Sequence, residues 1–485
     1  MDKSQYQIST KKSNKNKEPI LIPSRPELRH TAYQTLNLLL PKNPSHPKTV
    51  YFSNDPQLND NPQISHKNKI ITINDKMYMV LYKAYKNLPL CLSEPMKYNH
   101  VIRSKLFDNT NVIWKLLKKD KMMEFLPSIN SYQRFNHFPM TWELSRKDNL
   151  YLNYKRLKNK FPNDFTHLPE SYVLPQDMEL FAPIANNYHL TANNMWLIKP
   201  VASSRGRGIK LMTSIESLPN KGLVTKYISN PHLINNKKYD LRLYLLITGY
   251  TPLKIYLFKE GLTRFASEDY NLSEDDINNK FIHLTNYSIN KESENYQKNE
   301  EFDEEEGNKW SLHALKNHFA VKGIDFNKIW KQIEDIMIKT IISVTDKAIP
   351  LIKSFTNISS STLFELYGVD ILIDSKLNPW LMEVNLNPSL NCDSEIDLKI
   401  KSKLLTDIFN IIGVIPFSHD ENYTLLEEDK RFKNVIEETL AEFDRPTGSF
   451  ERIFPTKENI NKYSKYIENP GEENLLIWKK LKENK

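Results

Sequence analysis

Three oxygen-bearing side chains stand on two apolar segments that a short turn joins. Asp370 lies within the apolar residues 367–374, Ser375–Asn378 supplies the turn, and Glu383 and Asn385 follow two residues apart. Because strand side chains alternate, Glu383 and Asn385 share one face, and folding the hairpin brings Asp370 roughly opposite Glu383. Two carboxylates this close repel unless a cation or a proton lies between them. Hard oxygen ligands suit Mg²⁺, so the pattern favours a magnesium site over a solvated sheet edge.

A second group of charges alternates along one predicted strand. Lys238, Asp240 and Arg242 are separated by single residues, so a strand places all three on one face. Three charges on one face of a core strand are unfavourable unless they are paired or functional. An aspartate can accept hydrogen bonds from ribose hydroxyls, and an arginine can bind a terminal phosphate. A nucleotide contact and a structural ion pair at a strand end fit this pattern equally well.

Another strand delivers a lysine to a loop of small residues. Lys199 follows the apolar residues 195–198, and Gly206 and Gly208 lie in the loop after it. Such a loop can lay backbone N–H groups against phosphate oxygens while Lys and Arg side chains neutralise charge. Because the lysine precedes the loop, this is not a Walker loop. An ordinary surface loop and an Arg/Gly segment in contact with RNA are the alternatives.

Further polar residues lie in the second half of the chain. The segment His283–Lys291 is rich in hydrogen-bonding side chains and by itself is more typical of a capped loop. Arg264, Lys309 and Lys399 could receive an anionic substrate, although each alone is more typical of a surface charge. The acidic stretch 300–306 either is a solvated insertion or mimics an acidic peptide in an acceptor groove.

Two antiparallel hairpins must carry most of these residues. The apolar residues 241–248 and 254–258, joined by a turn at Gly249, predict the first hairpin. The second hairpin spans residues 366–385 and carries the carboxylates. Residues 222–228 predict a further strand.

Helices are predicted where apolar residues recur at helical spacing. The isoleucines between residues 329 and 341 indicate a long amphipathic helix, with Pro350 as its expected stop. A second helix is expected over about residues 398–412, with Gly413 as its C-terminal cap.

Composition and charge limit the class of protein. The 485 residues are 39% hydrophobic and 26% charged, which excludes collagen-like, mucin-like and wholly disordered chains. Two distant cysteines, Cys91 and Cys392, argue against a disulfide framework or a cysteine zinc site and favour a reducing compartment. The polar, basic start is no secretory signal, and no apolar run approaches the ~20 residues of a membrane span. A net charge of +8 favours anionic partners such as nucleic acid, acidic protein or anionic lipid.

In order and spacing, these segments resemble the tubulin tyrosine ligase-like proteins, which have an α/β ATP-grasp fold. The resemblance extends from about residue 114 to residue 416 and is specific because many motifs occur in the right order. It rests on residues 136–139, 143–148, 203–208, 238–242, 261–266, 283–291, 308–310 and 383–385. The polyglutamylase branch is most similar, through residues 201–208 and through Cys392-Asp393 leading to Asp397–Lys401.

The resemblance implies a role for each matching residue. ATP would be bound by Lys199, Arg205, Gly206, Thr225, Lys226, Tyr227, Ile228, Lys238, Tyr239, Asp240, Thr285 and Asn286. Arg205 and Arg242 would be catalytic at the transferring phosphate. Mg²⁺ would be held by Asp370, Glu383 and Asn385, and free L-glutamate by Arg264, Tyr287, Ser288, Lys309 and Lys399. Tyr239 replaces a frequent Phe, Thr263 a frequent Val and Thr225 a common Gln, so an adenine contact at Thr225 would come from the backbone or be weaker.

The resemblance also implies three ATP-grasp subdomains around a nucleotide cleft. These would be an N-terminal subdomain at 66–145, a central one with the phosphate loop at 146–224, and a C-terminal one at 225–415. Residues 1–65 are basic and expected to be mostly disordered, and residues 416–485 form a charged extension.

The implied activity is ATP-dependent ligation of free L-glutamate to the γ-carboxylate of glutamates in the acidic tail of tubulin, via an acyl-phosphate. The implied protein is a monomer of the cytoplasm and cytoskeleton, including the cilium or basal body. A tubulin glycine ligase on the same fold is the nearest alternative, although glycine needs fewer cations than Arg264, Lys309 and Lys399 provide. A non-catalytic microtubule-binding module is another.

Nucleic-acid binding is disfavoured, since no stacking motif or known module signature accompanies the Arg/Gly loop. The choices between α- and β-tubulin, and between chain initiation and elongation, stay open. We expect Glu383→Gln or Asp370→Asn to abolish ligation and leave folding intact.

Overall fold

The computed structural model describes residues 112–131, 133–186, 191, 194–201, 203, 206–212, 214–273, 276–299, 302, 305–355, 358–415, 417–418 and 434–483. It also describes the short segments 6–7, 22–23, 38–39, 42, 49–50, 77–83 and 101–104. The segment 1–65, predicted to be mostly disordered, lies almost wholly outside the described residues, as do Arg205 and most of the acidic stretch 300–306.

The chain divides into two compact units, each assembled from segments that are distant in sequence. The first unit comprises Met1–His137, Phe355–Phe364 and Lys401–Gly448. The second unit comprises Phe138–Ser354, Glu365–Ile400 and Ser449–Lys485, and every predicted site residue falls within these ranges. The division into five consecutive segments stays a prediction.

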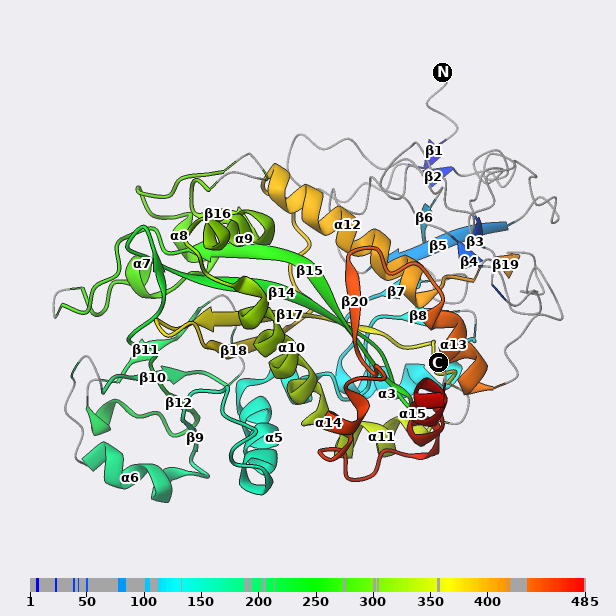
Figure 1. Cartoon of the computed structure of the whole chain (residues 1–485), viewed down its shortest axis with the longest axis horizontal. Coiled ribbons are helices and arrows are strands. Elements are labelled where there is room, and N and C mark those ends of the chain that lie inside the picture. Colours follow the sequence, from blue (N-terminus) through cyan, green and yellow to red (C-terminus); the bar gives the residue numbers. More distant parts are fainter. Residues whose placement is uncertain are drawn as a thin grey trace. The chain divides into compact units, whose positions relative to one another are not determined.

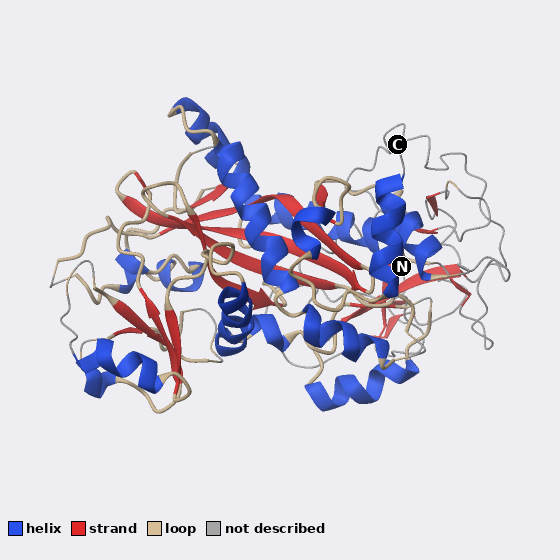
Figure 2. Ribbon diagram, turned by 60° about the horizontal axis from the view of Figure 1, so that its bottom comes forward, coloured by secondary structure: helices blue, strands red, loops and turns tan. Residues whose placement is uncertain are grey.

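A large antiparallel sheet forms the centre of the second unit (Figure 1). Strands β14 (Lys237–Tyr250) and β15 (Leu253–Phe265) are the first predicted hairpin, and β17 (Glu365–Ile373) and β18 (Pro379–Leu386) are the second. Strand β14 pairs with β17, so the two hairpins lie side by side, as the long ribbons in Figure 2 show. Strand β16 (Lys309–Ser311) adds to β15. Both predicted hairpins are confirmed.

The C-terminal residues complete this sheet. Strand β20 (Phe450–Phe454) pairs with β15, and helices α14 (Ile460–Ser464) and α15 (Glu472–Glu483) follow. The fully buried Asn474 of α15 donates to the carbonyl of Tyr250 (3.0 Å) and accepts from the N–H of Leu253 (2.8 Å). These two residues flank the turn between β14 and β15. Part of the charged extension is therefore integral to the sheet.

Helix α10 (Phe326–Ile342) is the predicted amphipathic helix, and it packs against β15, β18 and β20. Asp325 caps its start by accepting from the N–H of Asn327. The prediction that Pro350 stops this helix is wrong. The chain leaves α10 after Ile342, and Pro350 lies inside the next helix, α11 (Thr345–Lys353). Helix α10 therefore ends at Ile342 for a reason other than Pro350, which lies eight residues further along the chain.

A smaller four-stranded sheet carries the loop of small residues. Its order is β11-β10-β12-β9, with bounds Lys210–Leu211, Trp196–Lys199, Gly222–Lys226 and Ser171–Leu174. Helix α6 (Met178–Asn186) covers one face, where Phe181 packs edge-on against Trp196 with ring centroids 5.3 Å apart. Helix α5 (Lys147–Lys160) contacts strands β9 and β12 of this sheet.

The first unit contains a mixed sheet of β5 (Met77–Lys83), β6 (Val101–Ser104), β7 (Val112–Trp114), β8 (Arg134–Phe135) and β19 (Phe417–Ser418). The Trp114 ring packs edge-on against Phe364 and Phe409. Helix α12 (Glu395–Ile412), whose residues from Lys401 onward belong to this unit, begins earlier than predicted, and Gly413 follows it with a φ of +62°, which confirms the predicted cap. Helices α3 (Lys119–Phe125) and α13 (Val435–Phe443) also belong to this unit.

The remaining elements are short, except for the ten-residue α9. They are β1 (Tyr6–Gln7), β2 (Ile22–Pro23), β3 (Leu38–Leu39), β4 (Thr49–Val50), α4 (Trp142–Ser145), β13 (Leu233–Ile234), α7 (Lys280–His283), α8 (Tyr287–Asn290) and α9 (Leu312–Val321). In the part of the chain that is described, every helix is too short or too polar to cross a membrane.

Candidate active site

Strand register lines up the predicted acidic and basic residues across the large sheet. Asp240 pairs with Arg264, Arg242 pairs with Asp370, and Asp370 pairs with Glu383. These pairs span β15, β14, β17 and β18 in that order. The strand alternation inferred from the sequence therefore places these five charges in one row.

Two arginines hold the carboxylates in this row. Arg242 donates through Nε to Asp370 Oδ1 (2.6 Å) and through Nη2 to Oδ2 (3.1 Å). Arg264 donates through Nε and Nη2 to the two oxygens of Asp240 (2.8 and 2.5 Å), and its Nη2 lies 3.0 Å from Asp370 Oδ2. Such bidentate pairs fix both position and direction. The Asp240 carboxylate and the Arg242 guanidinium, which were predicted to contact ATP, are thus bound to other side chains of the protein.

Burial and the neighbouring charges shift the pKa values of these groups in opposite directions. Burial alone would raise the pKa of Asp370, but the guanidinium groups of Arg242 and Arg264 hold it well below its usual range. Burial alone would lower the pKa of Arg264, but Asp240 and Asp370 raise it. Asp370, Arg242 and Arg264 are therefore ionised near neutral pH.

Sequence reasoning gave no role to Lys147, which joins the predicted metal ligand to the phosphate loop. Its Nζ lies 3.1 Å from Glu383 Oε2 and donates to the carbonyl of Ser203 at 2.9 Å. Its backbone N–H donates to the carbonyl of Val201 at 3.3 Å. The only signal in the sequence was the motif 143–148, which belongs to the family resemblance.

The predicted metal ligands fit a hard divalent cation. Asp370 and Glu383 are opposite each other, and Asn385 donates through Nδ2 to Asp370 Oδ2 at 3.3 Å. Among the described residues, no three or more His, Cys, Asp and Glu side chains are arranged to hold a metal. Asp370, Glu383 and Asn385 would hold Mg²⁺ through oxygen atoms, which are the ligands this ion prefers.

Lys199 and Lys238 are buried, and each is attracted by one carboxylate of the charged row, Lys199 by Glu383 and Lys238 by Asp240. Burial lowers the pKa of Lys199 to about 8 and that of Lys238 to about 7. Lys238 donates to the Tyr227 hydroxyl and to the carbonyl of His283, both at 3.0 Å. Within the described part of the chain, neither lysine forms an ion pair. A buried ammonium group without a carboxylate partner is costly unless an anion binds there.

Gly206 brings the phosphate loop against a helix start. Its φ is +71°, and an added Cβ would lie 2.7 Å from Ile289 Cδ1 and 3.0 Å from Asn286 Oδ1. Asn286 is the N-cap residue of α8, and the preceding Thr285 is buried. The structure thus brings three predicted ATP residues together. Arg205, the fourth member of this group, lies outside the described residues.

We expect Gly206→Ala to destabilise the protein by about 1–2 kcal/mol, because a left-handed backbone is unfavourable for a residue with a Cβ. The close contacts to Ile289 and Asn286 should also weaken nucleotide binding. Urea unfolding and nucleotide titration would measure the two effects. Gly323→Ala is the matched control, since Gly323 has a φ of +69° and nothing within 4 Å of its added Cβ. Equal nucleotide affinity in both variants would contradict the expectation.

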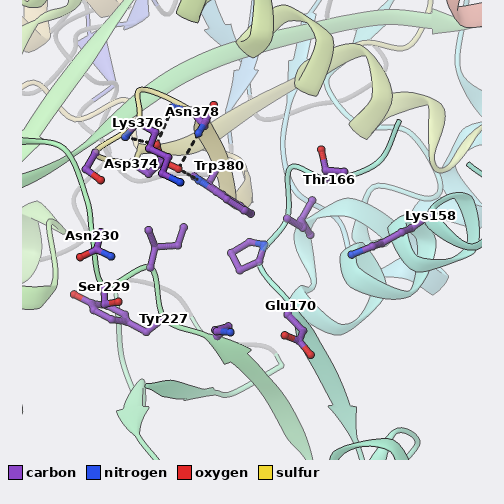
Figure 3. A pocket seen from close by; sticks show the side chains of 15 residues that line it. Lys158, Thr166, Glu170, Tyr227, Ser229, Asn230, Asp374, Lys376, Asn378 and Trp380 are labelled. Atoms are coloured by element: carbon purple, nitrogen blue, oxygen red, sulfur yellow. Dashed lines mark hydrogen bonds between the residues drawn. The ribbon is translucent and has the colours of Figure 1, made fainter. Parts of the chain in front are cut away.

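The predicted adenine segment borders a pocket of about 560 Å³ (Figure 3). Lys226, Tyr227 and Ile228 line it together with residues from the β17–β18 turn and from segment 166–170. None of the predicted metal or amino-acid residues lines this pocket. Thr225 is buried, and its hydroxyl lies 2.6 Å from that of Ser171, so the side chain has a protein partner.

Tyr239 is placed apart from the charged row. Its hydroxyl lies 2.9 Å from His232 Nδ1, and its ring packs against Phe265 with centroids 5.5 Å apart. Strand alternation turns it away from Lys238 and Asp240. The structure thus places Tyr239 in the packing of the sheet.

The predicted amino-acid residues separate into three environments. Arg264 belongs to the charged row. Lys309 is buried beside Tyr287, with Nζ 4.3 Å from the ring centroid, and Ser288 follows in α8. Lys399 is exposed, and its Nζ lies 4.0 Å from the centre of the Phe302 ring.

A paired-hairpin sheet with a row of buried charges, beside a smaller sheet that carries a glycine loop, defines the ATP-grasp class. The chain belongs to the tubulin-tyrosine ligase family, whose sequence profile matches residues 126–422. This confirms the predicted family and fold class.

Curated relatives narrow the comparison to one branch of the family. The chain is 37% identical over 410 residues to human tubulin polyglutamylase TTLL5, covering 73% of this chain and 32% of that protein. It is 35% identical over 406 residues to mouse tubulin monoglutamylase TTLL4, covering 72% of this chain and 34% of that protein. The chain thus spans about a third of the length of these relatives. A Caenorhabditis briggsae tubulin polyglutamylase, ttll-4, is 32% identical, with 64% of its length covered.

Proposed function

We propose that this chain is an ATP-dependent tubulin polyglutamylase that joins free L-glutamate to the γ-carboxylate of glutamates in the acidic tail of tubulin. The observation that carries the proposal is the row of Asp240, Arg264, Arg242, Asp370 and Glu383, together with two buried lysines that form no ion pair among the described residues. The similarity to relatives named tubulin polyglutamylase supports the choice of acceptor.

The proposed reaction has two steps in which bonds and charges balance. An oxygen of the acceptor carboxylate attacks the γ-phosphorus of ATP, ADP leaves, and an acyl-phosphate forms. The amino group of glutamate, after losing a proton, attacks the acyl carbon and expels phosphate, which leaves an isopeptide bond. The first step brings two anions together, so preorganised positive charge must offset their repulsion.

The residues divide this work between them. Lys199 and Lys238 would bind phosphate oxygens, and Gly206 and Asn286 would shape the loop around them. Asp370, Glu383 and Asn385 would hold Mg²⁺, which supplies further positive charge at the phosphates when bound. Arg242, fixed by Asp370, would present its guanidinium to the transferring group.

We expect ATP affinity to fall as the pH rises from about 7 to 9. Bound phosphates favour protonated Lys199 and Lys238, whose pKa values in the free protein are about 8 and about 7, so binding above these values takes up protons. The dissociation constant should rise by up to about tenfold per pH unit for each lysine. Calorimetric titration at several pH values, in buffers of different ionisation enthalpy, would measure both affinity and proton uptake.

Lys199→Arg is the matched variant for this measurement. Arginine stays charged throughout the range, so the variant should show a shallower pH dependence than the unmodified protein. A dissociation constant that does not change between pH 7 and 9 would contradict the assignment of these lysines to phosphate.

A tubulin glycine ligase is the second candidate. Two of the three cations assigned to glutamate already have buried carboxylate partners, because Arg264 pairs with Asp240 and Lys309 pairs with Asp397. Only the exposed Lys399 has no such pairing among the described residues. Glycine, with one carboxylate, would need fewer cations, so the paired state of Arg264 and Lys309 keeps this candidate open.

One experiment decides between these functions. The protein is incubated with microtubules, Mg-ATP and separately labelled glutamate, glycine and tyrosine, and the modified peptides are mapped by mass spectrometry. Incorporation of glutamate into acidic tail peptides supports the proposal, and glycine incorporation supports the second candidate. Microtubule binding without incorporation of any amino acid would support a non-catalytic module.

The proposed acceptor is supported by charge and by the names of the relatives. A basic chain, with net charge +8, attracts an acidic tail over long range, and salt should weaken that attraction. We propose that the protein is a monomer and that it acts on the cytoskeleton in the cytoplasm, including at the cilium or basal body.

A further inference from the structure

A buried ion pair supports one of the residues assigned to the amino-acid substrate. Lys309 Nζ lies 2.7 Å from Asp397 Oδ2, and the two side chains are only 8% and 2% exposed. The ammonium group also lies over the Tyr287 ring, 4.3 Å from its centroid. Lys309 is thus held from two directions, by a carboxylate and by an aromatic face.

The Asp397 carboxylate is itself fixed by the start of helix α12. The Ser394 hydroxyl donates to Asp397 Oδ2 at 3.1 Å, and the Asp397 N–H donates to Ser394 Oγ at 3.3 Å. This reciprocal contact, three residues apart at a helix start, resembles a capping box. The Asp397 carboxylate therefore takes part in capping the start of α12 and also binds Lys309, which belongs to strand β16.

We propose that Asp397 is a positioning residue, which fixes Lys309 against Tyr287 so that its ammonium group is correctly turned toward the incoming amino acid. This inference rests on the proposed ligase function. Asp397 is not required to touch the substrate, because its effect passes through Lys309. A flexible lysine has about 2 kcal/mol of rotamer entropy, and a fixed partner removes that freedom before the substrate binds.

Asp397→Asn tests this role in the full chain with labelled glutamate, microtubules and Mg-ATP. The variant should raise the KM for glutamate by about 10–100-fold, by analogy with the effect of residues that orient metal ligands. The KM for ATP should change much less, because Asp397 acts on Lys309, which lies outside the charged row. A change of both KM values by the same factor would overturn the assignment to the amino-acid subsite.

Asp335→Asn is the matched control. Asp335 Oδ2 lies 2.6 Å from Lys339, whose side chain is as buried as that of Lys309, but neither residue belongs to the proposed site. The control should lose stability without a change in the KM for glutamate. If Asp397→Asn and Asp335→Asn behave alike, the positioning role is wrong. If the unmodified protein ligates no amino acid, the proposed function has failed instead.

A double-mutant cycle separates positioning from a purely structural role. In a Lys309→Met background, Asp397→Asn should have no further effect on the KM for glutamate, because the residue through which it acts is gone. Additive effects would contradict the inference. Should Asp397→Asn fail to fold, Asp397→Glu carries the same test, since it keeps the charge but moves it by one methylene. An unchanged KM in Asp397→Glu would also contradict the inference.

Discussion

Glu383→Gln is expected to lower ligation on the order of 10²–10³-fold, the size seen when one charge-stabilising group is removed from an active site. The amide keeps an oxygen that can accept from Lys147, so the local hydrogen bond is retained while the negative charge is lost. The measurement is the rate of labelled amino-acid incorporation at saturating Mg-ATP, beside a urea unfolding curve.

Glu143→Gln provides the control for this substitution. Glu143 is about as exposed as Glu383, at 25% against 21%, and it also pairs with a lysine, Lys347, at 2.6 Å. It has no place in the charged row. Loss of activity in both variants, or full activity in Glu383→Gln, would remove Glu383 from the metal site.

The structure alters one expectation for the metal residues. Asp370→Asn was expected to leave folding intact, but Asp370 pairs with both Arg242 and Arg264. Removing its charge leaves two buried guanidinium groups with less compensation, which is strongly destabilising in a protein interior. Glu383→Gln is therefore the cleaner test of the metal assignment.

Arg264→Ala is expected to reduce the free energy of unfolding by about 3–5 kcal/mol, because it leaves Asp240 buried without its partner. Ligation should be lost as well, since Asp240 and Asp370 would no longer be held in line. Urea unfolding followed by circular dichroism measures the first effect, and amino-acid incorporation measures the second.

Arg264→Lys separates charge from geometry in this row. Lysine keeps the positive charge but cannot reproduce the paired contacts to Asp240. It should recover part of the stability and little of the activity. A stability of Arg264→Ala equal to that of the unmodified protein would mean that the row is not a coupled charge network.

Local pattern was enough to predict the two hairpins that carry the site. Alternation places Lys238, Asp240 and Arg242 on one face, and a turn at Gly249 marks the fold-back. The opposition of Asp370 and Glu383 could be predicted because their two strands are adjacent in sequence and joined by a short turn. Both steps of that prediction depend only on residues that are close together in the sequence.

Pairing between distant segments could not be predicted in the same way. The contact between Arg242 and Asp370 depends on which strand lies beside β14, and the sequence between them is 127 residues long. The same holds for Lys147 with Glu383 and for Lys309 with Asp397. Charge types suggested a functional role for the arginines and lysines, but their partners follow only from the packing of segments that are distant in sequence. Pro350 failed as a helix stop because the chain had already turned at Ser343.

The bond network around Asn474 has a practical consequence for anyone who shortens this protein. The family profile ends at residue 422, yet β20 and α15 lie beyond it and complete the sheet that holds the charged row. An expression fragment cut at that boundary would uncover the open edge of β15 and leave the Tyr250 carbonyl and the Leu253 N–H without their partner. Such a fragment would be prone to strand-to-strand aggregation, so the shortest useful fragment must extend through helix α15.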